Sequence, residues 1–260
     1  MTQRTIRRRC AAFLAIGAMA ALAMPSTAQA APQLADLDAK QSMSVKASNG
    51  ERLEGKDLHA IQLATYTAAS VDDNTIVGYD LTTNTALASD ITAAAKTAGA
   101  TDANLTINGK NDPMVWVVKN LTDSRSDPWS GKLRNFCNSL AKQTNFAKQE
   151  GTAVATLSQD KTTMSTGNVL VPGIYAIVDR TPATTTPSGG TAVKTTASIM
   201  MMNGTAVNGI SQLRTASGTT LTLGQVIYKV SSVETPDKKV NVGSTWKDSA
   251  SEAIGKNLTY

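Results

Sequence analysis

The chain has 260 residues, of which 41% are hydrophobic and 4% aromatic, enough for one or two domains with a buried core. Its formal net charge is +5, but four of its 25 basic residues fall within residues 1–30, which contain no acidic residue. The rest of the chain has 21 basic against 20 acidic residues, a balance that argues against nucleic acid or an anionic membrane as a partner.

Residues 1–30 have the pattern of a secretory signal peptide. Arg4–Arg9 form the charged region, Ala11–Ala23 the apolar region, and Ala28-Gln29-Ala30 a small-residue cleavage site. An uncleaved membrane anchor is the alternative, but Pro25 follows an apolar run that is short for a membrane span. We expect a mature N-terminus at Ala31 and no membrane contact after cleavage.

Cysteine is scarce in the mature chain. Cys10 precedes the apolar run of the leader and is removed with it, so only Cys137 remains. One thiol cannot form an internal disulfide, and an exported protein of this kind must therefore be stabilised by other means.

The first part of the mature chain predicts strands. Ser42–Ala47, Leu58–Thr67 and Ile76–Leu81 are rich in β-branched and apolar residues at a period of two. Asp72-Asp73-Asn74 predicts the turn that connects the second strand to the third.

Between about residues 85 and 145 the period changes to that of helices. Asn84 or Thr85 is suited to cap a first helix, which Gly99 would end. Asp112-Pro113 and Asp127-Pro128 each place a capping residue before a proline, and each predicts a further amphipathic helix. Cys137 falls on the apolar stripe of the last helix, so we expect it to be buried.

Strand patterns return from residue 152 and continue to residue 230. The predicted strands are Val154–Leu157, Asn168–Val171, Ile174–Val178, Ala197–Met202, Thr219–Leu223 and Gln225–Val230. Pro172-Gly173 predicts a turn, and the Thr-, Pro- and Gly-rich segment Arg180–Val193 predicts an exposed loop. The fold class that follows is mainly β, a sandwich with a helical insertion.

No constellation for catalysis or metal binding is evident. His59 is the only histidine, and no G-x-S-x-G motif accompanies a serine, so an exposed or hydrogen-bonded side chain is favoured over a catalytic base. The oxygen-rich segments Asp72–Asn74 and Asp123–Asp127 lack calcium-loop spacing, which favours turn and capping roles. We expect no enzyme activity, no metal and no cofactor.

Two segments carry a resemblance to a known family. E-T-P-D-K-K-V-N followed by D-S-A-S-E-A-I-G-K-N-L-T-Y, within Val226–Tyr260, resembles the opening of the isopeptide-forming domain of Gram-positive fimbrial subunits, the pilins that sortases assemble. Leu170–Asp179 resembles the L-x-P-G-x-Y hairpin of such domains, which ends on an acid.

The resemblance implies a domain organisation. Residues 31–234 would form an N-terminal Ig-like or Cna-B-like β-sandwich with the helical insertion at about 85–145. Residues 235–260 would supply the first strands of a second, incomplete isopeptide-forming domain, so that the chain is a fragment of a longer subunit.

The resemblance also implies candidate isopeptide residues. Lys238 is favoured as the amine of the second domain by its spacing ahead of Val240, and Lys239 is the alternative. In the first domain, Asp179 would be the assisting acid and Lys46 the amine, although no Asn closes the last strand. An ordinary surface aspartate is the favoured interpretation of Asp179.

The function that the resemblance implies is structural: a backbone pilin of a cell-surface fimbria that supports adhesion, located at the cell wall. Its partners would be other pilin subunits, joined through a sortase. An accessory surface adhesin that binds a host glycan or matrix protein is the alternative, and a secreted hydrolase is disfavoured because the chain has a single histidine.

Overall fold

The structure is a computed structural model, and strands account for more of the chain than helices do, so the mainly β prediction is confirmed. It describes residues 32–48, 51–107, 109–121, 131–181, 185–188, 191–195, 201–215, 218–228, 232–234, 240–242 and 245–247.

The largest sheet in the described residues has eight strands and is built around the long strand β3 (Leu58–Asp72). Its main path runs β13 (Met201–Gly204), β10 (Gly173–Asp179), β3, β4 (Thr75–Thr83), β14 (Gln212–Arg214) and β15 (Thr220–Thr222). Two short strands, β1 (Gln33–Leu34) and β7 (Thr152–Ala153), also pair with β3.

The β3–β4 hairpin turns where the sequence predicts it. Asp73 and Asn74 have φ values of 45° and 55°, the left-handed conformation that a tight hairpin turn requires. Asn and Asp tolerate this conformation better than other non-glycine residues. The predicted turn at Asp72–Asn74 is confirmed.

A second sheet has four strands in the order β16 (Gln225–Tyr228), β2 (Ser44–Ala47), β9 (Thr163–Ser165) and β8 (Thr156–Leu157). β2 and β16 come from distant parts of the chain and pair in parallel, with Gln225 opposite Ser44 and Tyr228 opposite Ala47. The strand that opens this sheet therefore runs alongside the strand that completes it, in the same direction.

The central strand β3 of the large sheet is buried on both faces. Successive side chains of a strand point to opposite sides, so the buried residues of β3 divide between two clusters. On β3, Leu58 and Ala60 belong to one apolar cluster and Ile61 and Leu63 to another. The first cluster also contains residues of β2, β9 and β16, so the four-stranded sheet packs on that face. The second cluster contains the buried residues of the helices.

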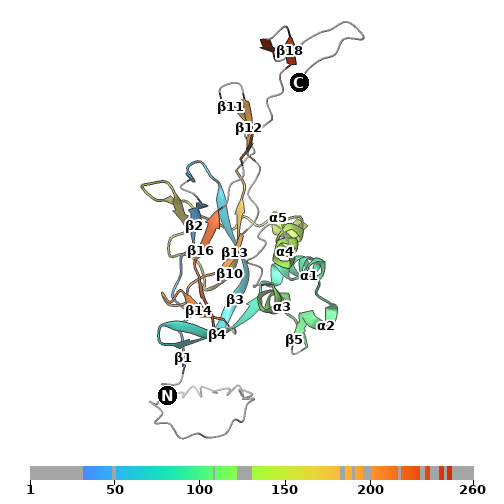
Figure 1. Cartoon of the computed structure of the whole chain (residues 1–260). Helices are drawn as coiled ribbons and strands as arrows, with labels where there is room; N and C mark the ends of the chain where they lie inside the picture. The colour runs from blue at the N-terminus through green and yellow to red at the C-terminus, as the bar shows by residue number, and fades with distance from the viewer. Residues whose placement is uncertain are drawn as a thin grey trace, which may run out of the picture. The chain divides into compact units, whose positions relative to one another are not determined.

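All described helices come between β4 and β7 in the chain, and Figure 1 shows them gathered beside the large sheet. They are the 3-10 helix η2 (Thr85–Leu87) and the α-helices α1 (Ala88–Thr97), α2 (Asp102–Leu105), α3 (Pro113–Asn120), α4 (Lys132–Leu140) and α5 (Thr144–Ala147). A short hairpin of β5 (Thr106–Ile107) and β6 (Lys110–Asn111) lies between α2 and α3 in sequence.

The first predicted helix is confirmed at both ends. The Asn84 side chain accepts a hydrogen bond from the backbone N–H of Ala86 at 3.1 Å, and Gly99, with φ of 105°, follows the last turn of α1. Leu87, Ile91 and Ala94 of its apolar stripe are buried.

The two aspartate–proline pairs behave differently from the prediction. α3 begins at Pro113 as expected, but the Asp112 side chain accepts no hydrogen bond from its own helix and bonds to Thr83 of β4 instead. α4 begins at Lys132, after Gly131, so the prediction that Asp127-Pro128 starts this helix is wrong. Asp127 and Pro128 themselves lie outside the described residues.

The predicted hairpin at residues 168–178 is only half present. β10 starts at Gly173, but the preceding segment makes a single bridge, between Leu170 and Gln41, rather than a strand. The predicted loop at Arg180–Val193 contains two paired strands, β11 (Thr185–Ser188) and β12 (Thr191–Thr195). The loop prediction is therefore wrong for these residues, whose Thr-rich composition also suits strands.

Three short strands complete the described residues. β17 (Ser232–Glu234) pairs with β12, and β18 (Val240–Val242) pairs with β19 (Thr245–Lys247). The domain boundary expected at residues 234–235 stays a prediction, and the segment 254–260 lies outside the described residues.

Candidate functional site

A buried cluster of three side chains joins three distant segments of the chain. Asp179 lies at the end of β10, Lys56 in the loop before β3, and Tyr228 at the end of β16. The side chain of Asp179 is 1% exposed and that of Lys56 15%, and their charged atoms are 3.7 Å apart. The Tyr228 hydroxyl donates a hydrogen bond to the same carboxylate oxygen, Oδ2. We call these three residues the Asp179 cluster.

Further contacts satisfy the remaining groups of the Asp179 cluster. The second carboxylate oxygen of Asp179 accepts a hydrogen bond from the backbone N–H of Thr181 at 2.8 Å, and the Thr181 hydroxyl accepts one from the backbone N–H of Asp57 at 2.8 Å. The Lys56 ammonium lies 5.5 Å from the centroid of the Tyr228 ring, within cation–π range. Because a buried charge without partners is costly, these contacts are what permit the burial of Asp179.

The interpretation of Asp179 as an ordinary surface aspartate is therefore wrong. Its partners lie at positions 56 and 228, which no local pattern connects to position 179. Lys46 is exposed on β2, where its backbone pairs with Thr163 and Ile227, and no ion pair within the described residues joins it to Asp179.

The other isopeptide candidates stay predictions. Lys238 and Lys239 lie outside the described residues. The amine that the structure brings to Asp179 is that of Lys56, which the sequence patterns did not single out. The Asp179 cluster has the chemistry of an ion pair reinforced by a phenol, which ties β16 to β10 and to the loop before β3.

His59 lies beside Asp57, two residues earlier in the chain. Its Nε2 atom lies 2.8 Å from Asp57 Oδ1, and its buried Nδ1 atom has no hydrogen-bond partner among the described residues. The interpretation of His59 as a hydrogen-bonded side chain is consistent with this contact. Within the same residues, no group of three or more His, Cys, Asp and Glu side chains is placed to hold a metal ion.

Cys137 is buried in the helical cluster, as predicted, with 3% of its surface exposed. Burial raises the pKa of its thiol to about 11, against a smaller opposing effect of Arg134. A thiol held neutral at ordinary pH is a poor nucleophile and a poor metal ligand.

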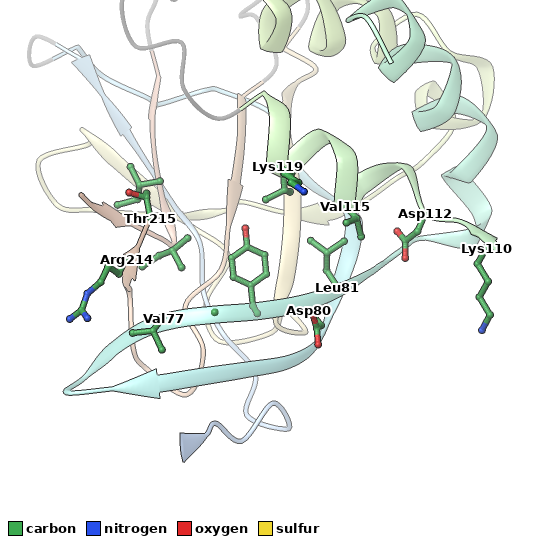
Figure 2. A pocket seen from close by; sticks show the side chains of 14 residues that line it. Val77, Asp80, Leu81, Lys110, Asp112, Val115, Lys119, Arg214 and Thr215 are labelled. Atoms are coloured by element: carbon green, nitrogen blue, oxygen red, sulfur yellow. The ribbon is translucent and has the colours of Figure 1, made fainter. Parts of the chain in front are cut away.

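A surface groove is a further feature that the sequence analysis missed. It has a volume of about 770 Å³ and lies between residues 77–81 of β4, the outer face of α3 and the β14–β15 hairpin (Figure 2). We call it the β4 groove. Its lining comes from three distant segments, so no local sequence pattern could predict it. Gly78 within a strand was the one available signal, because such a glycine often marks a place where a ligand or another backbone comes close.

The chain matches no family model, no curated protein and no solved structure. No helix among the described residues is long and apolar enough to cross a membrane.

Proposed function

We propose that this protein is a structural subunit, a backbone pilin, of a Gram-positive cell-surface fimbria. The observation that carries the proposal is the parallel pairing of β2 with β16, in register from Ser44 and Gln225 to Ala47 and Tyr228. In a fibre, each subunit must transmit tension from the segment before its first core strand to the segment after its last.

The geometry of this pair resists such tension. The chain enters β2 at Ser44 and leaves β16 at Tyr228, which are at opposite ends of the pair. Tension on the two flanking segments therefore pulls the strands along their length in opposite directions. The hydrogen bonds of the pair are evenly spaced and all loaded together, so they resist in parallel instead of opening one at a time.

The Asp179 cluster adds a second attachment at the end where β16 leaves the sheet. Tyr228 is the last residue of β16, and its hydroxyl is bonded to the buried carboxylate of Asp179 on β10. This contact ties β16 to the large sheet as well as to β2. Breaking this attachment would leave the buried Asp179 carboxylate without its partners, which is costly.

The proposal also assigns the domains of the chain. We assign residues 31–234 to an Ig-like or Cna-B-like β-sandwich in which residues of about 85–145 form a helical insertion, and residues 235–260 to the start of a second domain. The packing of the four-stranded sheet on the large sheet supports the first assignment. The position of every described helix between β4 and β7 supports the helical insertion.

In this proposal the leader at residues 1–30 directs export, and a sortase joins the subunit to its neighbours at the cell wall. Lys238, with Lys239 as the alternative, is the candidate isopeptide amine of the second domain, and Lys46 that of the first. The pairing of Ile227 with Lys46 puts this lysine on the strand pair that carries tension.

Immunogold electron microscopy of the source cells tests the proposal. Antibodies raised against residues 31–234 should label filaments along their length, because a backbone subunit repeats throughout the fibre. Labelling confined to filament tips would indicate an accessory adhesin, and label found only in the medium would contradict a fibre role.

A further inference from the structure

One edge of β4 is largely open. β4 pairs with β3 along its length, but on its other side it pairs within the described residues only through Ile76, opposite Leu213 of β14. In an antiparallel pair, alternate residues turn their N–H and C=O groups away from the partner strand. Alternate residues of Val77–Leu81 therefore present backbone donors and acceptors on the side away from β3.

The two walls of the β4 groove are held at opposite ends of this edge. β14 is attached at Ile76, and α3 is attached at Thr83, where the Asp112 carboxylate accepts the Thr83 backbone N–H at 3.0 Å and the Thr83 hydroxyl accepts the N–H of Met114 at 3.0 Å. The intervening stretch has room for a strand of about five residues at roughly 3.3 Å each.

The floor of the groove is shaped for close approach of another backbone. The β3–β4 register shifts beside Gly78, and a Cβ atom built on Gly78 would meet nothing within 4 Å. Bulges of this kind are over-represented at sheet edges and beside functional sites. A glycine within a strand often marks a position where a second chain comes close.

The walls and floor supply apolar contacts. Half-buried and buried apolar side chains line the groove: Tyr79, Leu81, Val115, Val118, Leu213 and Leu221. A strand laid along β4 would direct alternate side chains toward these residues and the others outward.

Three cations follow the length of the groove. Arg214 lies at the β14 end, Lys110 at the far end and Lys119 between them (Figure 2). Within the described residues, neither Lys110 nor Lys119 has an acidic partner, and Arg214 has one, Asp72, at 4.0 Å. The two exposed lysines, which have no acidic partner among the described residues, favour an anionic occupant of this apolar groove.

Two carboxylates also line the groove, and they locate the anionic positions. Asp112 is engaged as an acceptor from both the N–H and the hydroxyl of Thr83. Asp80 is exposed on β4 and lies below Leu81 in Figure 2, while Asp112 lies between Leu81 and Lys110. The carboxylates of an occupant are therefore best placed toward Lys119 and Arg214.

From these observations we propose that the β4 groove binds an extended, acidic peptide segment of another protein, which adds a short strand to the open edge of β4. The backbone groups of Val77–Leu81 provide the hydrogen bonds, the apolar lining selects alternate side chains, and Lys119 and Arg214 select carboxylates. This binding role goes beyond the fibre role and does not depend on it.

A displayed library of random seven-residue peptides, selected against the mature protein, tests the proposal. Enriched peptides should alternate apolar or β-branched residues with Asp or Glu. For a synthetic copy of the most enriched peptide, Gly78→Trp should raise Kd at least ten-fold because the indole fills the groove, and Lys119→Glu at least three-fold. Thr156→Trp adds the same side chain at an exposed position of β8, outside the groove, and should leave Kd unchanged.

Amide hydrogen exchange distinguishes strand addition from side-chain binding. The peptide should slow exchange at Val77–Leu81, and this protection should be absent in Gly78→Trp. Lys119→Glu changes only an exposed side chain, so it keeps the test decisive if Gly78→Trp does not fold.

Three results would overturn the proposal: no enrichment of acidic peptides, a Kd unaffected by Gly78→Trp and Lys119→Glu, or binding without protection of Val77–Leu81. Self-association of the mature protein that Gly78→Trp abolishes would likewise overturn it, because a second copy of the chain would then occupy the groove.

Discussion

The ammonium of Lys56 lies 3.7 Å from the carboxylate of Asp179, and the two side chains are 15% and 1% exposed. The lysine belongs to the loop that leads into β3 and the aspartate to the end of β10, adjacent strands that pair as far as Leu58 and Asp179. The contact therefore closes the end of the β3–β10 pair, at the point where Tyr228 brings β16 to the same carboxylate.

Removing the amine of this pair should destabilise the protein. Lys56→Met keeps the aliphatic stem but leaves the buried Asp179 carboxylate without its cation, and we expect a loss of about 3 kcal/mol in unfolding free energy. Tyr228→Phe removes one hydrogen bond to the same oxygen and should cost about 1–3 kcal/mol. Urea unfolding measures both. Lys142→Met, at an exposed position with no role in the cluster, is the control and should change stability by less than about 0.5 kcal/mol.

The thiol of Cys137 should react slowly in the native state. It is buried, and its pKa is raised to about 11. A thiol reagent should therefore label it at a rate set by opening of the protein, and labelling should become rapid in denaturant. Rapid labelling of the native protein at neutral pH would show that Cys137 and the apolar stripe of α4 are not buried.

The same thiol makes stability depend on pH in the alkaline range. Its pKa is higher in the folded chain, about 11, than the reference value of 9.0, so the unfolded state releases its proton first. The contribution of Cys137 is fully present below pH 9 and is lost as the pH rises toward 11. The unfolding free energy should fall less steeply over this window in Cys137→Ala than in the native protein.

The carboxylate of Asp112 should matter more to stability than its neighbour in the groove. Asp112→Ala removes the acceptor for both the backbone N–H and the hydroxyl of Thr83, which attach α3 to β4, and should cost about 1–3 kcal/mol. Asp80→Ala, at an exposed position on the same strand, should be close to neutral. Thermal unfolding of the two variants compares them directly, and equal losses would show that Asp112 does not hold the helix.

Two glycines in strands should differ in how well they tolerate a methyl group. A Cβ on Gly173 would overlap the carbonyl oxygen of Ala64, at the position where β10 meets β3. Gly173→Ala should therefore cost about 2 kcal/mol or more, since backbone must move to admit it. Gly78→Ala points into open space and should have little effect. Denaturant midpoints of the two variants check the difference.

Local patterns predicted the parts of the fold that local chemistry determines. The turn at Asp73-Asn74 depends on residues that tolerate positive φ, and the first helix on the cap at Asn84 and the glycine at Gly99. The period of two at Leu58–Thr67 predicted the strand that became part of β3. Each of these features is determined by residues within a few positions of one another.

Tertiary contacts decided the features that the sequence analysis missed. Asp112 has the sequence signature of a helix cap, but its Oδ1 atom accepts hydrogen bonds from the N–H and the hydroxyl of Thr83, which the sheet brings close. Asp179 is buried because Lys56 and Tyr228 converge on it. The β4 groove likewise requires β4, α3 and β14 to be placed together, which no local pattern records.

Single-molecule force measurement tests the central claim, that the β2–β16 pair transmits tension through the subunit. Pulling on the mature chain from its two ends loads this pair along its length. Pulling instead through cysteines placed at Asp80 and Gln159, both exposed, leaves the pair outside the direct line of force. Forced unfolding reports the unfolding rate, so the two directions compare the barriers directly.

Our account predicts a higher unfolding force when the chain is pulled from its ends than when it is pulled through positions 80 and 159. It also predicts that Val45→Pro, which removes a backbone N–H from the centre of β2, lowers the first force more than the second. An unfolding force from the ends that is equal to or lower than the force through positions 80 and 159 would contradict a tension-bearing role.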